Sequence, residues 1–160
     1  MTLPEGVTLQ WERLSEITRD LRPLLKRHWT EVEDHKDLLP LDPAWGLMLQ
    51  YDLLTLLRVL TVRSDGVLVG YLFLFFPPSL HYSTSVISYV ERFWLEPSLR
   101  KGWLGIQLFK EAETLAREAK AVLMLVPFRT SFLNRRGKGI GAILKRLGYK
   151  TEEITYAKVL

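Results

Sequence analysis

The spacing of the hydrophobic residues changes along the chain, and each change marks a predicted element. From Val7 to Arg13 apolar and polar residues alternate, which predicts a half-buried strand. From Glu16 to Glu33 the apolar residues recur every three or four positions, which predicts a helix with one apolar face. Pro23 predicts a kink or a restart within that helix. Trp45 to Leu54 is a shorter predicted helix.

The centre of the chain is rich in β-branched and aromatic residues. Leu57 to Arg63 and Val67 to Phe76 are two such runs, and the Asp-Gly pair between them predicts a hairpin. Ser83 to Leu95 is a longer predicted strand. A helical pattern from Trp103 to Ala119 and a continuous apolar run from Ala121 to Val126 then predict a βαβ unit with a buried parallel strand.

The last part of the chain predicts a helix that ends near Leu147 with Gly148 as its cap, followed by a closing strand from Tyr149 to Leu160. The order of elements is therefore β-α-α-β-β-β-α-β-α-β. With 160 residues, 48% of them hydrophobic and 25% charged, the chain is long enough for one core. We expect a single α/β domain over residues 1–160.

Composition excludes several kinds of chemistry. The chain has no cysteine, which excludes a disulfide framework, a thiolate metal site and a cysteine nucleophile. No apolar run reaches the roughly 18 to 20 residues of a membrane helix, and the N-terminus has no signal pattern, so we expect a soluble, cytoplasmic protein with no membrane partner.

Charge is distributed unevenly along the chain. Residues 1–96 carry 9 Lys/Arg against 13 Asp/Glu, a net −4, whereas residues 97–160 carry 13 against 5, a net +8. An anionic ligand would favour the second part, and a cationic amine the first. The alternative is an uneven distribution over solvated faces.

The segment from Glu91 to Gly105 leads from a predicted strand into a predicted helix through a basic turn that contains glycine. Main-chain N–H groups at a helix start have no intrahelical partner, and the helix dipole adds positive potential there. Glycine allows a ligand to approach the main chain closely. The segment therefore predicts a phosphate-binding turn.

This segment resembles the signature of the GNAT acyltransferases, a valine-x-proline strand end followed by Arg/Gln-x-x-Gly-x-Gly/Ala. Leu95 takes the valine position, Pro97 the proline, Arg100 the basic position and Gly105 the last small position. The chain departs from the signature at Trp103, where glycine is usual, with a glycine one residue earlier.

The resemblance implies a GNAT fold, with a central mixed, mostly antiparallel twisted sheet flanked by helices and a splayed strand pair that holds the cofactor. It also implies acetyl-CoA as the cofactor, bound by residues of the strand end and the turn. These are Phe93, Trp94, Leu95, Arg100, Lys101, Gly102, Trp103, Leu104, Gly105 and Ile106. The implied activity is direct transfer of an acetyl group to a primary amine of a small molecule or a protein, and many relatives form homodimers.

Two residues are candidates for proton transfer. The resemblance places Glu91 where many GNAT enzymes have a general base, and its apolar strand would raise its pKa by desolvation. Alternatively, Glu91 forms an ion pair with Arg92. The family's usual tyrosine acid would fall at Leu144, so Tyr149 is the candidate acid, with Tyr156 as an alternative.

Other signals are weaker. His28, Glu31 and His81 are candidate contacts for the acceptor, and the spacing of the His and Glu residues matches no common metal site. Arg136 to Ala142 is rich in glycine but lacks a strand directly before it, so we interpret it as a basic loop. The tryptophans are not interleaved with cations in the way that favours a nucleic acid partner.

A narrower resemblance is to GNAT-like proteins encoded by phages and prophages. The short motifs that carry it are Leu41 to Trp45, Leu80 to Tyr82 and Arg146 to Tyr149. A second interpretation of the whole chain is a catalytically weak or inactive GNAT-like module that binds a protein or nucleic acid partner. Trp103 in the turn and the missing tyrosine favour that alternative.

Overall fold

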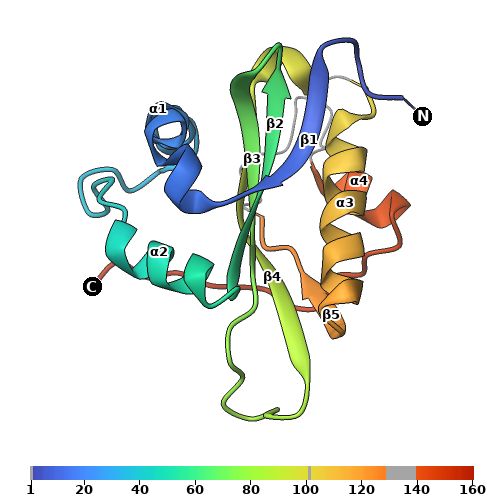
Figure 1. Ribbon diagram of the computed structural model, residues 1–160. Helices are drawn as coiled ribbons and strands as arrows, with labels where there is room; N and C mark the ends of the chain where they lie inside the picture. The colour runs from blue at the N-terminus through green and yellow to red at the C-terminus, as the bar shows by residue number, and fades with distance from the viewer. Residues whose placement is uncertain (1, 101, 129–139) are drawn as a thin grey trace. The chain divides into compact units, whose positions relative to one another are not determined.

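The computed structural model describes residues 2–100, 102–128 and 140–160 (Figure 1). Its contacts divide the chain into two compact units, residues 1–127 and 128–160. The first unit contains a five-stranded sheet in the order β1-β2-β3-β4-β5. Its strands are β1 (Val7–Glu12), β2 (Leu57–Ser64), β3 (Val67–Phe75), β4 (Val86–Leu95) and β5 (Ala121–Leu125).

The sheet is mixed and mostly antiparallel, as predicted. Pairs β1-β2, β2-β3 and β3-β4 are antiparallel, and β4-β5 is parallel. The hairpin predicted at the Asp-Gly pair is confirmed, because β2 and β3 join through Asp65 and Gly66, both with positive φ.

Helices cover both faces of this sheet. Figure 1 shows α1 (Leu14–Val32) and α2 (Trp45–Leu53) on one side and α3 (Leu104–Glu118) on the other. Alternate residues of β3 point to the α1 face, where they join a core with the apolar stripe of that helix. This core includes Leu14, Ile17, Leu21, Leu24, Tyr71, Phe73 and Trp94. On the other face Phe93 packs edge-on against Phe109 of α3.

The predicted restart at Pro23 is not found. Helix α1 continues through Pro23, which lies on its exposed side. Burial of Leu21 and Leu24 on the opposite side holds the helix together there, although proline removes one main-chain donor.

Strand β4 is longer than its pairing with β5. The parallel pairing runs from Val86↔Ala121 to Tyr89↔Leu125 and stops, while β4 continues to Leu95 along β3. On the β3 side, Phe73 pairs with Arg92 and Leu74 with Val90, so Glu91 is an extra residue in β4. Such a bulge bends a strand. The bulge therefore lies two residues past the last pairing with β5, at the place where the splayed strand pair was expected.

The second unit contains α4 (Ile140–Arg146). Gly148 has φ +92° and its N–H donates to Lys145 O, while the N–H of Tyr149 donates to Leu144 O. This is a Schellman motif, so the predicted glycine cap is confirmed. The closing strand predicted for residues 149–160 is not found, because residues 150–160 form no strand pairing and are exposed. Strand propensity alone does not produce a strand without a partner.

No helix among the described residues has the length and apolar character needed to cross a membrane.

The core beneath α1 contains one polar pair. Nδ1 of His28 and the hydroxyl of Tyr71 share a hydrogen bond of 2.6 Å, and both side chains are buried. Burial lowers the pKa of His28 to about 4, and the positive charge of Arg92 adds to this effect. Burial also raises the pKa of Tyr71, so both groups are neutral near pH 7.

We expect His28 to make stability depend on pH. Because its folded pKa of about 4 lies below its ordinary value of 6.5, protonation favours the unfolded chain as the pH falls between these values. The stabilisation present above pH 6.5 should fall by about 3 kcal/mol by pH 4. Urea unfolding across this range should show the slope in wild type and in the exposed-loop control His81→Gln, but a flatter profile in His28→Phe. An equal slope in His28→Phe would contradict this assignment.

Candidate functional site

The connection from β4 to α3 forms a tight, uncapped helix entry. It contains a short 3₁₀ turn (Pro97–Leu99), and Trp103 is the N-cap residue of α3, with no side-chain hydrogen bond capping the helix. The first intrahelical bond runs from Gln107 N–H to Trp103 O, at 3.0 Å. The N–H groups of residues 104–106 precede that bond, and the first turn has no acidic residue. These features favour an anion at the start of α3.

The two glycines of this turn have different roles. Gly102 has φ +92°, a left-handed conformation that other residues rarely adopt, which explains why the glycine falls one residue earlier than the family signature places it. Gly105 lies in the first turn of the helix, and a Cβ atom there would meet no atom of the described residues within 4 Å. Among these residues, nothing fills the space beside Gly105. Trp103 is 48% exposed, and Lys101 lies outside the described residues.

The Arg100 side chain turns back into the protein. Its Nε donates to Leu95 O at 2.8 Å, and its two terminal nitrogens contact the two carboxylate oxygens of Glu31, with Nη2 to Oε2 at 2.6 Å. The indole N–H of Trp94 donates to Glu31 at 2.8 Å. The Arg100 contact lowers the pKa of Glu31, which keeps it ionised. Arg100 and Glu31, predicted to serve different ligands, are therefore bound to each other.

Glu91 is the bulged residue of β4 and is exposed. Its side chain is 45% exposed and its Oε1 lies 3.3 Å from Arg92 Nη1, so the ion pair considered as an alternative does form. Desolvation by the surrounding protein nevertheless raises the pKa of Glu91, and Arg92 opposes this only in part. Beyond Glu91, residues Phe93, Trp94 and Leu95 form the part of β4 that no described β5 residue pairs with.

The remaining predicted residues are not gathered at this turn. His28 is buried against Tyr71, as described above. His81 is exposed in the loop between β3 and β4, which joins β4 at the end away from the turn. Tyr149 and Tyr156 belong to the second unit, and their roles stay predictions. Of the glycine-rich segment 136–142, residues 136–139 lie outside the described residues.

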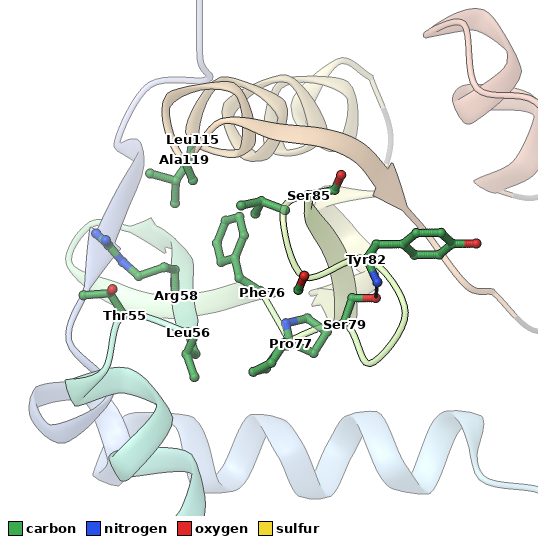
Figure 2. Close-up of a pocket in the computed structure, with 13 residues that line it drawn as sticks. Thr55, Leu56, Arg58, Phe76, Pro77, Ser79, Tyr82, Ser85, Leu115 and Ala119 are labelled. Carbon is green, nitrogen blue, oxygen red and sulfur yellow. Dashed lines mark hydrogen bonds between the residues drawn. The ribbon is translucent and has the colours of Figure 1, made fainter.

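Sequence reasoning missed a cavity of about 480 Å³ at the other end of α3 (Figure 2). Its lining comes from the start of β2, the loop after β3 and the C-terminal end of α3. The labelled residues are Thr55, Leu56, Arg58, Phe76, Pro77, Ser79, Tyr82, Ser85, Leu115 and Ala119. Ala119 lies fifteen residues after Leu104, about 22 Å along the helix, so the cavity is separate from the turn. No sequence motif marks these residues.

Comparisons with known proteins give a match in structure only. No protein-family model matches the chain, and no curated protein sequence does. A solved aminoglycoside acetyltransferase from an uncultured soil metagenomic sample is 14% identical, with a TM-score of 0.74 over 96% of this chain and 98% of that one. The ribosomal-protein-alanine N-acetyltransferase of Brucella melitensis biovar Abortus 2308 is 15% identical, with a TM-score of 0.69 over 96% and 99%.

A third solved structure is the aminoglycoside N-acetyltransferase AAC(6')-Iy in complex with CoA. It is 18% identical, with a TM-score of 0.69 over 99% of each chain. At such low identity the likeness establishes the fold: the chain has the GNAT acetyltransferase fold over nearly its full length. These matches do not support the narrower resemblance to phage proteins.

The two glycines give a matched test of the turn. Gly102→Ala should destabilise the protein by about 1 kcal/mol, because alanine is strained at a φ of +92°. Gly105→Ala should leave stability unchanged or raise it by up to about 1 kcal/mol, because the added Cβ meets open space in a helix. Urea unfolding of both variants measures the difference. Equal effects of the two substitutions would rule out this geometry.

Proposed function

We propose that the protein is an N-acyltransferase that moves the acetyl group of acetyl-CoA to a primary amine by direct attack in a ternary complex. The observation that carries this proposal is the combination, in one segment, of a β4 edge that no described β5 residue pairs with beyond Tyr89 and a start of α3 that contains Gly102 and Gly105. The same fold occurs in a ribosomal-protein-alanine N-acetyltransferase and in an aminoglycoside acetyltransferase, which supports the proposal.

The chemistry of the turn fits the pyrophosphate of acetyl-CoA. Main-chain N–H groups of residues 102–106 are the donors for the phosphate oxygens, and Lys101, Trp103 and Ile106 are proposed contacts. The unpaired edge of β4 at residues 93–95 suits the amide groups of the pantetheine arm, as an added strand would. Acetyl-CoA supplies an acetyl group already activated as a thioester.

Glu91 is the proposed general base. An amine must lose its proton before it attacks, and a carboxylate with a raised pKa is a better acceptor for that proton near neutral pH. A main-chain N–H near Trp94 or Leu95 would stabilise the negative charge that develops on the carbonyl oxygen. Tyr149 is the proposed proton donor to the departing thiolate.

The acceptor is proposed only as a class, a primary amine of a small molecule or a protein. The net −4 of residues 1–96 favours a cation, and the candidate contacts His28, Glu31 and His81 all belong to this part of the chain, although His28 is buried against Tyr71 and Glu31 is bound to Arg100. The aminoglycoside and ribosomal-protein enzymes of this fold act on different amines, so the fold does not determine the acceptor.

The proposal predicts binding of acetyl-CoA. At about a hundred times the dissociation constant, the ligand should stabilise the protein by about 2.7 kcal/mol, measured by urea unfolding with and without it. Gly105→Ala should weaken binding, measured by calorimetry, because its Cβ occupies the space left for the ligand, although the variant stays folded.

If the wild-type protein bound no acetyl-CoA, the proposal would fail. The alternative, a partner-binding module with this fold, would then be preferred. Its support is the half-exposed Trp103 at the turn. Salt-dependent binding to nucleic acid, or capture of a defined protein partner, would be the next measurement.

Glu91→Gln should lower kcat about 100-fold or more with little change in the affinity for acetyl-CoA. Thiol release in an amine panel measures the rate. In the wild type the rate should rise with pH as Glu91 loses its proton, at a pH above the ordinary glutamate range, because its pKa is raised. Arg92→Gln should move this rise to higher pH, because Arg92 holds the pKa down. A pH profile that is the same in wild type and Glu91→Gln would exclude the base assignment.

A further inference from the structure

Two residues of α1 hold the end of β4 and the start of the turn. Glu31 receives three contacts there, two from the Arg100 guanidinium and one from the indole N–H of Trp94. Four positions earlier on the same helix face, Arg27 binds both carboxylate oxygens of Glu96, each at 2.7 Å. Glu96 and Arg100 lie on either side of the 3₁₀ turn. The turn is thus held by α1 at both of its ends.

Trp94 lies between these two ion pairs. The Arg27 guanidinium carbon lies 5.0 Å from the centroid of the indole ring, and that of Arg100 lies 5.6 Å from it. The ring is 4% exposed and belongs to the α1 core. Because a planar guanidinium binds a carboxylate through two nitrogens at once, both pairs fix orientation as well as distance.

We propose that Glu31 and Arg27 are positioning residues that set the path of the turn from β4 to α3 and so prepare it for the phosphates of acetyl-CoA. This inference rests on the proposed function. It gives Glu31 a role different from direct contact with the acceptor amine. The proposal also makes the effect of Arg100 on the coenzyme indirect. Its hydrogen bond to Leu95 O holds the main chain that leads into the turn.

The physical reason is the cost of ordering the turn. Gly102 adopts a conformation that only glycine reaches easily, and among the described residues the side chain of the N-cap residue Trp103 forms no capping hydrogen bond to α3. The ion pairs with α1 add long-range contacts that restrict the path of this turn. If the turn is already ordered before the ligand binds, the free energy of binding does not include the entropy lost in ordering it.

The variant Glu31→Gln distinguishes a positioning role of Glu31 from an effect of its negative charge. The substitution keeps the shape of the side chain but weakens both arginine contacts, so the positioning role predicts about tenfold weaker binding of acetyl-CoA. The KM for acetyl-CoA should rise while kcat changes little. If Glu31 acted only through its negative charge, its removal would raise the positive potential at the turn and tighten binding. The two roles therefore predict opposite signs.

Glu16→Gln is the matched control. It removes one negative charge from the exposed N-terminal turn of the same helix, fifteen residues and about 22 Å from Glu31. It should leave the affinity for acetyl-CoA unchanged. Arg27→Gln should weaken binding in the same direction as Glu31→Gln, because it releases the other end of the turn.

The indole N–H signal of Trp94 in a ¹H–¹⁵N spectrum reports the network without any ligand, and its absence in Trp94→Phe assigns it. Glu31→Gln should shift this signal, whereas Glu16→Gln should not. Unchanged or tighter binding by Glu31→Gln, in a wild-type background that binds acetyl-CoA, would overturn the inference and leave the proposed function standing. No binding by the wild-type protein would overturn both, even if the indole signal shifts as expected.

Discussion

The site depends on how the main chain of β4 is hydrogen-bonded. Strand β4 has two edges with main-chain groups that can form hydrogen bonds, and β3 pairs with one of these edges along most of its length. The other edge is paired with β5 only as far as Tyr89. The bulge at Glu91 lies just past this point, where it bends the strand and places two successive charged side chains, Glu91 and Arg92, outside the core. An edge of β4 that no described β5 residue pairs with and an exposed carboxylate therefore lie next to each other.

The C-terminal end of β4 leads into the turn before α3, which is the second feature that the proposed site requires. Phe93 packs on α3 and Trp94 on α1, so successive residues of β4 are fixed by different layers of the fold. Because Trp94 is buried between Arg27 and Arg100, the α1 layer reaches the turn that starts α3. The turn that follows β4 is therefore supported from both faces of the sheet.

Electrostatics at the turn differ from what a basic sequence suggests. Arg100 looks like a free phosphate ligand in the sequence, but its guanidinium binds a carboxylate from a helix about seventy positions earlier. The positive potential at the start of α3 then comes from the main chain and the helix dipole. Most substitutions leave main-chain donors in place, because only proline lacks the N–H group.

The sequence by itself determined most of the elements, because their signals are local. The periods of the other strands and helices, the Asp-Gly hairpin and the glycine cap at Gly148 depend on neighbours within a few residues and appear where expected. The apolar run 121–126 does form strand β5, but this strand is not buried as predicted, since Val122 is 72% and Leu123 44% exposed. The sequence also predicted the turn after β4, since proline, arginine and glycine mark it at short range. The closing strand was predicted wrongly, because a strand requires a partner that propensity does not supply.

Only the tertiary structure decided which charges meet. The pairing of Glu31 with Arg100 joins residues 69 positions apart, and the hydrogen bond of His28 with Tyr71 joins residues 43 positions apart. The bulge at Glu91 depends on how β4 pairs with β3. The cavity near Phe76 is lined by residues from β2, the loop after β3, the start of β4 and the end of α3. No local pattern encodes such contacts, because the energy of an ion pair or a buried hydrogen bond depends on distance and solvent exposure, which exist only once the sheet and its two helical layers have assembled.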